Sequence, residues 1–175
     1  MAAAVDEELG IRRDQLDDQE QARRAQRLYH DHLLSRWLPV LGATRNPEAV
    51  NILPHGLHSE DQRVRINAVE GLACVCTDQV AEELAKRLPT ETEPVQCAIM
   101  QAMRRNNDAR HVQALLAVAG EPTMVETKLV WIETMQAVAP AKARPVLTKW
   151  TGSPNESLAK AVVAALAAEG GEGVE

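Results

Sequence analysis

Apolar side chains recur along most of the chain with the spacing of an α-helix. Val80, Leu84 and Leu88 follow one another at i, i+4 and i+8, and Val64 and Ala68 are also four residues apart. Because a helix completes a turn in about 3.6 residues, side chains at these spacings lie on one face and pack against a core. The pattern predicts an all-α protein.

The helical segments form two interleaved series with a period near 30 residues. The first series begins at Val64, Val95, Val125 and Leu158, and the second is centred near Val50, Val80, Val112 and Val146. Proline or glycine lies between the segments, as at Pro89, Gly120, Pro140 and Pro154, where these residues end or begin helices. One helix pair cannot bury its own apolar face, so stacked pairs are needed. The period predicts a right-handed α-solenoid of about four helical hairpins.

The stretch "DQRVRINAVEGLACV", Asp61 to Val75, has an Asp, then Val-Arg, then an apolar helix with small residues. With a repeat near 30 residues, it resembles the HEAT repeat, in particular the short form also seen in phycobilin lyases. The resemblance covers roughly residues 47–168 and weakens along the chain, since Gln96 replaces the Arg in the next repeat. In that family the Asp and the Arg hydrogen-bond between repeats, which the resemblance implies for Asp61 and Arg65. We expect Arg63 to serve repeat stacking as well.

The two ends of the chain differ from the repeats. Residues 1–18 are acidic and residues 169–175 are rich in Gly and Glu, so both are expected to be disordered. The solenoid domain is expected over 19–168 and to begin with a helix over 19–42, whose second half is apolar and whose first half is polar. This helix either caps the first repeat or projects as an arm that contacts a partner or a second copy of the chain.

Composition limits the class of protein. The chain has no Phe and one Tyr, so Leu, Val and Ala must fill its core, which favours helices. A net charge of −6 argues against nucleic-acid binding, which needs clustered Lys and Arg. No apolar run is long enough for membrane insertion and no secretory signal precedes the repeats, so a cytoplasmic location is expected. The excess of Arg over Lys would suit a GC-rich bacterial genome.

Few residues suggest chemistry. The three cysteines, Cys74, Cys76 and Cys97, lack metal-ligand spacing and are expected to be buried, reduced thiols. His30 and His32 diverge on a helix, while His55 and His58 could face together but have no obvious further ligands. No catalytic motif is present. We therefore expect no enzymatic activity, no metal and no cofactor.

The best candidate surface belongs to the second helix of each hairpin, which in such solenoids usually lines the inner face. Its charge shifts from mixed to basic towards the C-terminus, which suits a protein partner with an acidic segment. Trp131 is either buried in the core or an anchor for the partner, and Trp150 has the same two possibilities. The expected partner-binding residues are Arg104, Arg105, Arg110, His111, Trp131, Lys142, Arg144, Lys149 and Trp150.

These features predict a non-enzymatic protein-protein interaction module, such as an adaptor, an accessory subunit or a regulator. Two alternatives stay open. One is an enzyme, or a lyase or chaperone-like activity, on the same scaffold. The other is a structural subunit of a larger assembly, connected through the N-terminal helix. The oligomeric state is not predicted by the sequence.

Overall fold

A computed structural model describes residues 20, 21, 23, 36–44, 49–107, 109–120 and 122–170 of the chain. Every regular element in these ranges is a helix, which confirms the predicted all-α class. Beyond the helical residues 36–43, the elements are α2 (Ala49–Gly56), α3 (Gln62–Val75), α4 (Asp78–Arg87), the 3-10 helix η1 (Leu88–Thr90), α5 (Glu93–Arg105), α6 (Val112–Val118), α7 (Val125–Val138), α8 (Pro140–Trp150) and α9 (Glu156–Gly170). The last helix ends two residues beyond the predicted boundary at 168.

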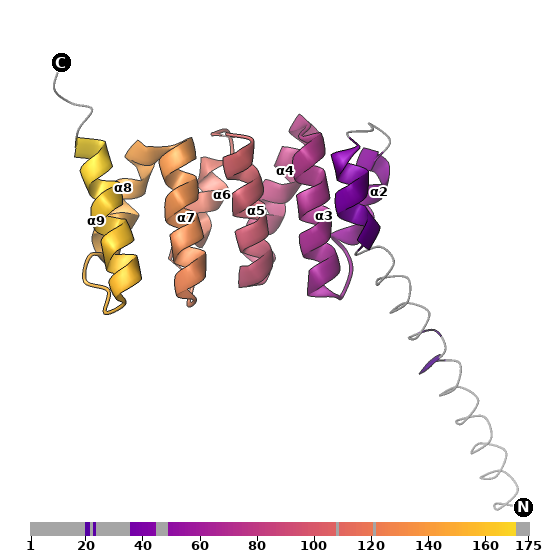
Figure 1. Cartoon of the computed structure of the whole chain (residues 1–175), viewed down its shortest axis with the longest axis horizontal. Helices are drawn as coiled ribbons and strands as arrows, with labels where there is room; N and C mark the ends of the chain where they lie inside the picture. The colour runs from indigo at the N-terminus through magenta and orange to yellow at the C-terminus, as the bar shows by residue number, and fades with distance from the viewer. Residues whose placement is uncertain are drawn as a thin grey trace, which may run out of the picture.

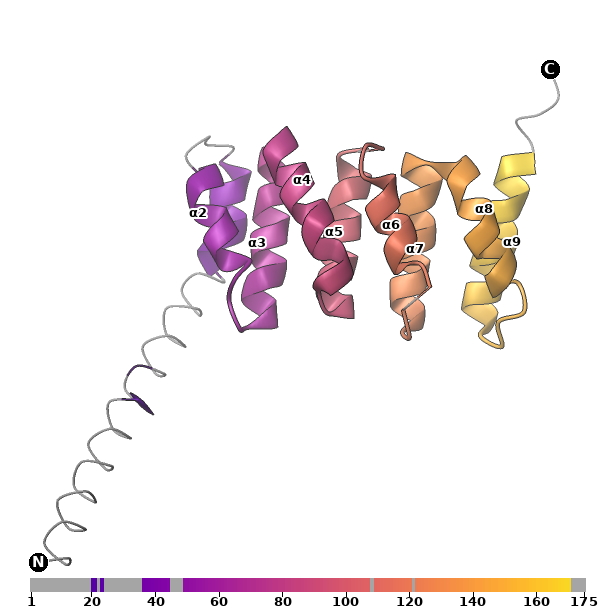
Figure 2. The ribbon, with the colours of Figure 1, turned by 180° about the vertical axis from the view of Figure 1, so that it is seen from behind.

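The helices lie in two rows (Figure 1). The longer helices α3, α5, α7 and α9 stand side by side, each packed on the next. The shorter helices α4, α6 and α8 form the second row, which faces the viewer in Figure 2. Each helix of the second row follows one of the first row along the chain, as the two interleaved apolar series predict. No helix in the described part of the chain is both long and apolar enough to cross a lipid bilayer.

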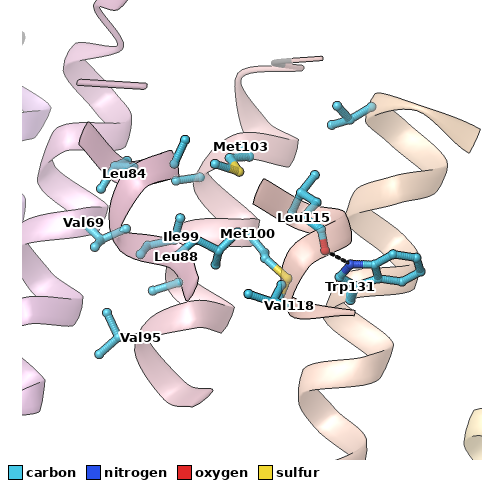
Figure 3. Packing of buried hydrophobic residues seen from close by; sticks show 14 of the residues in the cluster. Val69, Leu84, Leu88, Val95, Ile99, Met100, Met103, Leu115, Val118 and Trp131 are labelled. Carbon is cyan, nitrogen blue, oxygen red and sulfur yellow. Dashed lines mark hydrogen bonds between the residues drawn. The ribbon is translucent and has the colours of Figure 1, made fainter. Parts of the chain in front are cut away.

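The core runs continuously between the two rows. Side chains from α3 to α7 meet there, including Val69, Ile99, Met100 and Leu115 (Figure 3), all of them almost fully buried. Val64, Val95 and Leu158, which begin equivalent segments, are buried in this same core. Burial of each such side chain stabilises the fold by about 1.5–3 kcal/mol. Because each unit contacts mainly its neighbours, this core forms only when the units stack.

The helical residues 36–43 pack against α3 through two glycines. The backbones of Gly42 and Gly71 lie so close that a Cβ added at Gly42 would collide with the backbone of Gly71. A Cβ at Gly71 would lie 2.6 Å from the carbonyl oxygen of Leu38, whose own side chain is fully buried. This segment therefore covers the open side of α3, as a cap would. The middle of the predicted helix, residues 24–35, lies outside the described residues.

Candidate interaction surface

Helix α8 carries three exposed basic side chains, Lys142, Arg144 and Lys149. It begins at Pro140, whose fixed φ suits the first turn of a helix, directly after Ala139 ends α7. No Asp or Glu occurs in residues 134–155. Within the described residues, neither Lys142 nor Lys149 forms an ion pair with a carboxylate. The surface of α8 is therefore locally positive on a chain of net charge −6.

Trp150, the last residue of α8, is half-buried beside these charges. Its ring meets the ring of Trp131 edge to face, with centroids 5.2 Å apart. The ammonium group of Lys128 lies 5.8 Å from the centroid of Trp150, within cation–π range. We call Lys128, Lys142, Arg144, Lys149 and Trp150 the α8 surface.

Trp131 was among the expected partner-binding residues, but it does not belong to this surface. It is fully buried, and its indole Nε1 donates a hydrogen bond of 2.7 Å to the carbonyl oxygen of Leu115 (Figure 3). A buried indole with a satisfied N–H is a core residue. Its contribution to the surface is indirect, because it holds the ring of Trp150.

Two further candidates link successive units instead of joining the α8 surface. Arg104 pairs with Glu133 on α7, and Arg110 pairs with Asp78 on α4 at 2.6 Å. All four side chains are at least 40% exposed, so each pair adds at most about 1 kcal/mol to stability. Each arginine nevertheless has a carboxylate beside it, which offsets its charge.

The last two candidates, Arg105 and His111, also lie apart from α8. Arg105 is exposed in the last turn of α5, and His111 is the half-buried residue that precedes α6. Of the predicted set, Lys142, Arg144, Lys149 and Trp150 thus share helix α8, and Lys128 joins them through its contact with Trp150. Lys128 was missed because it is distant from Trp150 in the sequence, and only the fold places the two side chains together.

The three predicted repeat-stacking residues differ in what their side chains contact. The carboxylate of Asp61 caps its own helix, accepting a hydrogen bond of 2.8 Å from the backbone N–H of Arg63. Arg65 does join two units, because its Nε donates to Glu91 at 3.1 Å, just before α5. The side chain of Arg63 is exposed and makes no polar contact within the described ranges. Of the three, Arg65 alone reaches the next unit through its side chain here.

Arg87 was not predicted to join units, yet it is the centre of a partly buried polar network. Its guanidinium donates to the carbonyl oxygen of Leu57 at 2.8 Å, to Glu83 at 3.0 Å and to Glu91 at 3.4 Å. The side chains of Arg87 and Glu91 are 18% and 10% exposed. The sequence signal that could have indicated this contact is the repeat period, since Leu57 precedes Arg87 by 30 residues.

Glu93 was also missed. Its carboxylate accepts hydrogen bonds from the backbone N–H groups of Thr123 and Met124, both at 3.0 Å, and from the hydroxyl of Thr123. The Thr123 hydroxyl is the main cause that lowers the pKa of Glu93 to about 2, with the Thr127 hydroxyl and the two backbone N–H groups assisting. This acid is therefore a structural link between α5 and α7.

The cysteines are less buried than the sequence suggested. Cys76 is exposed and Cys74 is half-buried, and both line an open groove of about 650 Å³ together with Arg105 and Asn106. Cys97 is half-buried and its Sγ lies 3.6 Å from the hydroxyl oxygen of Thr127, and burial raises the pKa of its thiol. The three thiols form no disulfide. The expectation that all three thiols are buried is wrong for Cys76, because α3 ends at Val75 and leaves Cys76 beyond the packed part of the helix.

A second groove, of about 380 Å³, lies between α2 and α4 and is lined by His58, Glu82, Glu83 and Lys86, among others. Glu82 is exposed, and a hydrogen bond from Lys86 lowers its pKa, the opposite of the raised pKa that suits a general acid. His58 lies against Arg87 at 3.0 Å, and His55 is exposed. His30 and His32 lie outside the described residues. Within those residues, no three His, Cys, Asp or Glu side chains converge on a common point.

Comparison with known proteins does not add a family. No protein-family model matches the chain, and a search of curated proteins gives no similar sequence. The resemblance to HEAT repeats therefore rests on the repeat pattern and on Asp61 and Arg65 alone.

Proposed function

We propose that this protein is a non-enzymatic interaction module, built as a right-handed α-solenoid of HEAT-like hairpins, that binds an acidic segment of a protein partner on the α8 surface. The observation that carries the proposal is the separation of charges in the described ranges. The arginines between units, such as Arg65, Arg87, Arg104 and Arg110, have carboxylate partners, whereas Lys142 and Lys149 have none. Cations without internal partners are available to an acidic ligand.

Trp150 supports the same proposal. Its ring is supported on one side by Trp131 and lies beside the ammonium of Lys128, while part of it stays exposed. A partly exposed indole beside a cation is a common anchor at protein interfaces, because it offers apolar area at small entropic cost. The partner segment would place carboxylates near Lys142 and Lys149 and an apolar side chain on Trp150.

The test is a pull-down from native extract with the full chain and with Lys142→Glu/Lys149→Glu. The matched control is Lys86→Glu/Lys160→Glu, which changes the net charge equally on α4 and α9, where each lysine is exposed and pairs within its own helix. We expect a stoichiometric protein partner that the α8 variant loses and the control variant retains, with binding that weakens as salt rises. Equal capture by all three proteins, or capture of nucleic acid in place of a protein, would refute the proposal.

A second role, as a subunit of a larger assembly, is favoured by apolar side chains at the N-terminal end of the rows. Trp37, Val40 and Ile52 are 59%, 50% and 46% exposed. Exposed apolar side chains at the end of a helix stack favour contact with another protein surface. Light scattering of the full chain and of Trp37→Ser/Val40→Ser tests this role. A higher oligomer in the parent protein that the variant loses would support it, whereas a monomer in both would refute it.

A further inference from the structure

A stripe of positions that is covered on α7 is exposed at the equivalent positions of α9. On α7 the stripe consists of Val125, Leu129, Ile132 and Gln136, and 31 residues later, one repeat period, it consists on α9 of Glu156, Lys160, Val163 and Ala167. All four positions on α7 are buried or half-buried, and all four on α9 are exposed. Ile132 is 4% exposed and Val163 is 62% exposed, so an apolar position that one unit buries is left in solvent by the next.

The difference arises from the neighbouring helix. Helix α9 packs on α7, and none of the other helices that the structure describes lies on the far side of α9 (Figure 1). In a stack of repeats each unit is covered by the next, so an uncovered unit leaves its apolar face open. Glu156 and Lys160 form an ion pair of 2.6 Å within this stripe, so their charges offset each other. We call these four positions of α9 the Val163 stripe.

The opposite end of the rows also exposes apolar side chains. The helical residues 36–43 turn Leu38 and Gly42 towards α3. Val40 is two positions from each of them, and side chains two positions apart on a helix diverge by about 200°. Val40 therefore lies on the side of this helix that faces away from α3, where it is 50% exposed, and Trp37 beside it in the sequence is 59% exposed. Each end of the rows thus has apolar area that the described chain does not cover.

The two ends carry opposite charge in the sequence, which favours one occupant for these surfaces. The predicted helix over 19–42 contains four Arg and two acidic residues, a formal charge of +2. Residues 156–175 contain four Glu and one Lys, a formal charge of −3. Opposite charges favour contact between the two different ends, and like charges disfavour contact between two identical ends. A second copy of the chain, bound end to end, satisfies both the apolar and the charge requirement.

We propose that copies of this chain join end to end, with Trp37 and Val40 of one copy packed on the Val163 stripe of the next. The contact joins two different surfaces, so each pair of copies keeps one free surface of each kind. Further copies then add until a ring closes or an open chain grows. The inference rests on the second role proposed above, a subunit of a larger assembly, and adds the partner and the surface that it uses. It does not involve the residues of the α8 surface.

Analytical ultracentrifugation of the full chain over a range of concentrations measures this association. We expect the mass to rise beyond that of a dimer. Val163→Glu should weaken the association at least about ten-fold, because the contact would bury an unpaired carboxylate. Ala137→Glu is the matched control, since Ala137 is exposed on α7 in the interior of the first row and receives the same charge. It should associate as the parent protein does, and circular dichroism checks that each variant is folded. Equal association of the parent protein and Val163→Glu would overturn the proposal.

Mixing two variants tests the direction of the contact. Val40→Glu keeps the Val163 stripe and Val163→Glu keeps the opposite end, so each alone should be monomeric and an equal mixture should form a dimer that grows no further. Dimers of Val163→Glu alone would show that two N-terminal ends meet, which overturns this inference and leaves the second role intact. A parent protein that is monomeric at every concentration would overturn both. Neither result affects binding at the α8 surface, which the pull-down measures separately.

Discussion

Glu93 accepts a hydrogen bond of 3.0 Å from the backbone N–H of Met124, the residue that precedes α7. Met124 occupies the N-cap position of α7 and has no side-chain oxygen that could accept such a bond itself. The first turn of a helix leaves backbone N–H groups without partners, and a carboxylate there also interacts favourably with the helix macrodipole. One unit therefore provides the cap for the helix of the next unit, which joins their stabilities.

We predict that Glu93→Gln lowers the free energy of unfolding by about 1–2 kcal/mol at pH 7, the usual effect of losing a helix cap. Urea unfolding followed by circular dichroism measures this change. Glu70→Gln is the control, because Glu70 is exposed in the middle of α3 and its change should matter by less than about 0.5 kcal/mol. Equal effects of the two substitutions would mean that the cap contributes nothing.

The contribution of Glu93 should also depend on pH. Its folded-state pKa of about 2 is below the usual 4.5, so the carboxylate stabilises the fold above pH 4.5. That stability is lost progressively as the pH falls from about 4.5 to about 2, where the folded protein also takes up the proton. We expect the difference in unfolding free energy between the parent protein and Glu93→Gln to shrink across this window. A difference that stays constant down to pH 2 would contradict the assigned pKa.

Arg87 and its neighbour Lys86 should respond very differently to substitution. Arg87 is largely buried between Leu57, Glu83 and Glu91, so Arg87→Met leaves Glu91 buried with one partner fewer. We expect a loss of about 2 kcal/mol in the free energy of unfolding, measured with urea. Lys86→Met, one position earlier, removes an exposed pair with Glu82 and should cost less than about 0.5 kcal/mol. A similar cost for the two would show that the buried network adds no stability.

The helices could be predicted from the sequence because each unit repeats its apolar positions. Val64, Val95 and Leu158 were singled out as the starts of equivalent segments, and all three are at most 2% exposed. Hydrophobic periodicity indicates a buried face whatever the neighbouring helix is. The helix ends were harder, since α9 continues to Gly170 and α3 stops before Cys76.

The polar contacts between units could not be predicted to the same degree. Arg65 was identified through a family resemblance, but Leu57, a partner of Arg87, and Met124, a partner of Glu93, lie about 30 residues away in sequence. Nothing in their local sequence distinguishes them from ordinary charged residues on a helix. Trp131 shows the limit for apolar residues too, because its position beside the main apolar face was compatible with both exposure and burial. Whether such a face is covered depends on α6 and α8, which pack against it.

The close approach at Gly71 predicts sensitivity to a single methyl group. A Cβ there would lie 2.6 Å from the carbonyl oxygen of Leu38 and 2.8 Å from Cδ2 of Leu53, so the segment 36–43 would have to move away from α3. We expect Gly71→Ala to cost about 1–3 kcal/mol of unfolding free energy and to increase proteolysis next to this segment. Gly120→Ala is the control, because nothing lies within 4 Å of its added Cβ and its φ is negative. It should be neutral or slightly stabilising, and a Gly71→Ala protein as stable as the parent would refute the close packing.

Cys76 gives the opposite prediction, that a substitution stabilises the protein. Its φ of 41° is a left-handed conformation that costs a residue with a Cβ about 1–2 kcal/mol, and glycine adopts it without strain. Glycine also makes the unfolded chain more flexible, so we expect Cys76→Gly to raise the unfolding free energy by about 0.5–1 kcal/mol net. Asn107→Gly, at φ 48°, should gain less, because Asn tolerates this region. Urea unfolding of both variants decides the question. A Cys76→Gly protein less stable than the parent would mean that contacts of the Cys76 side chain outweigh the strain of its backbone.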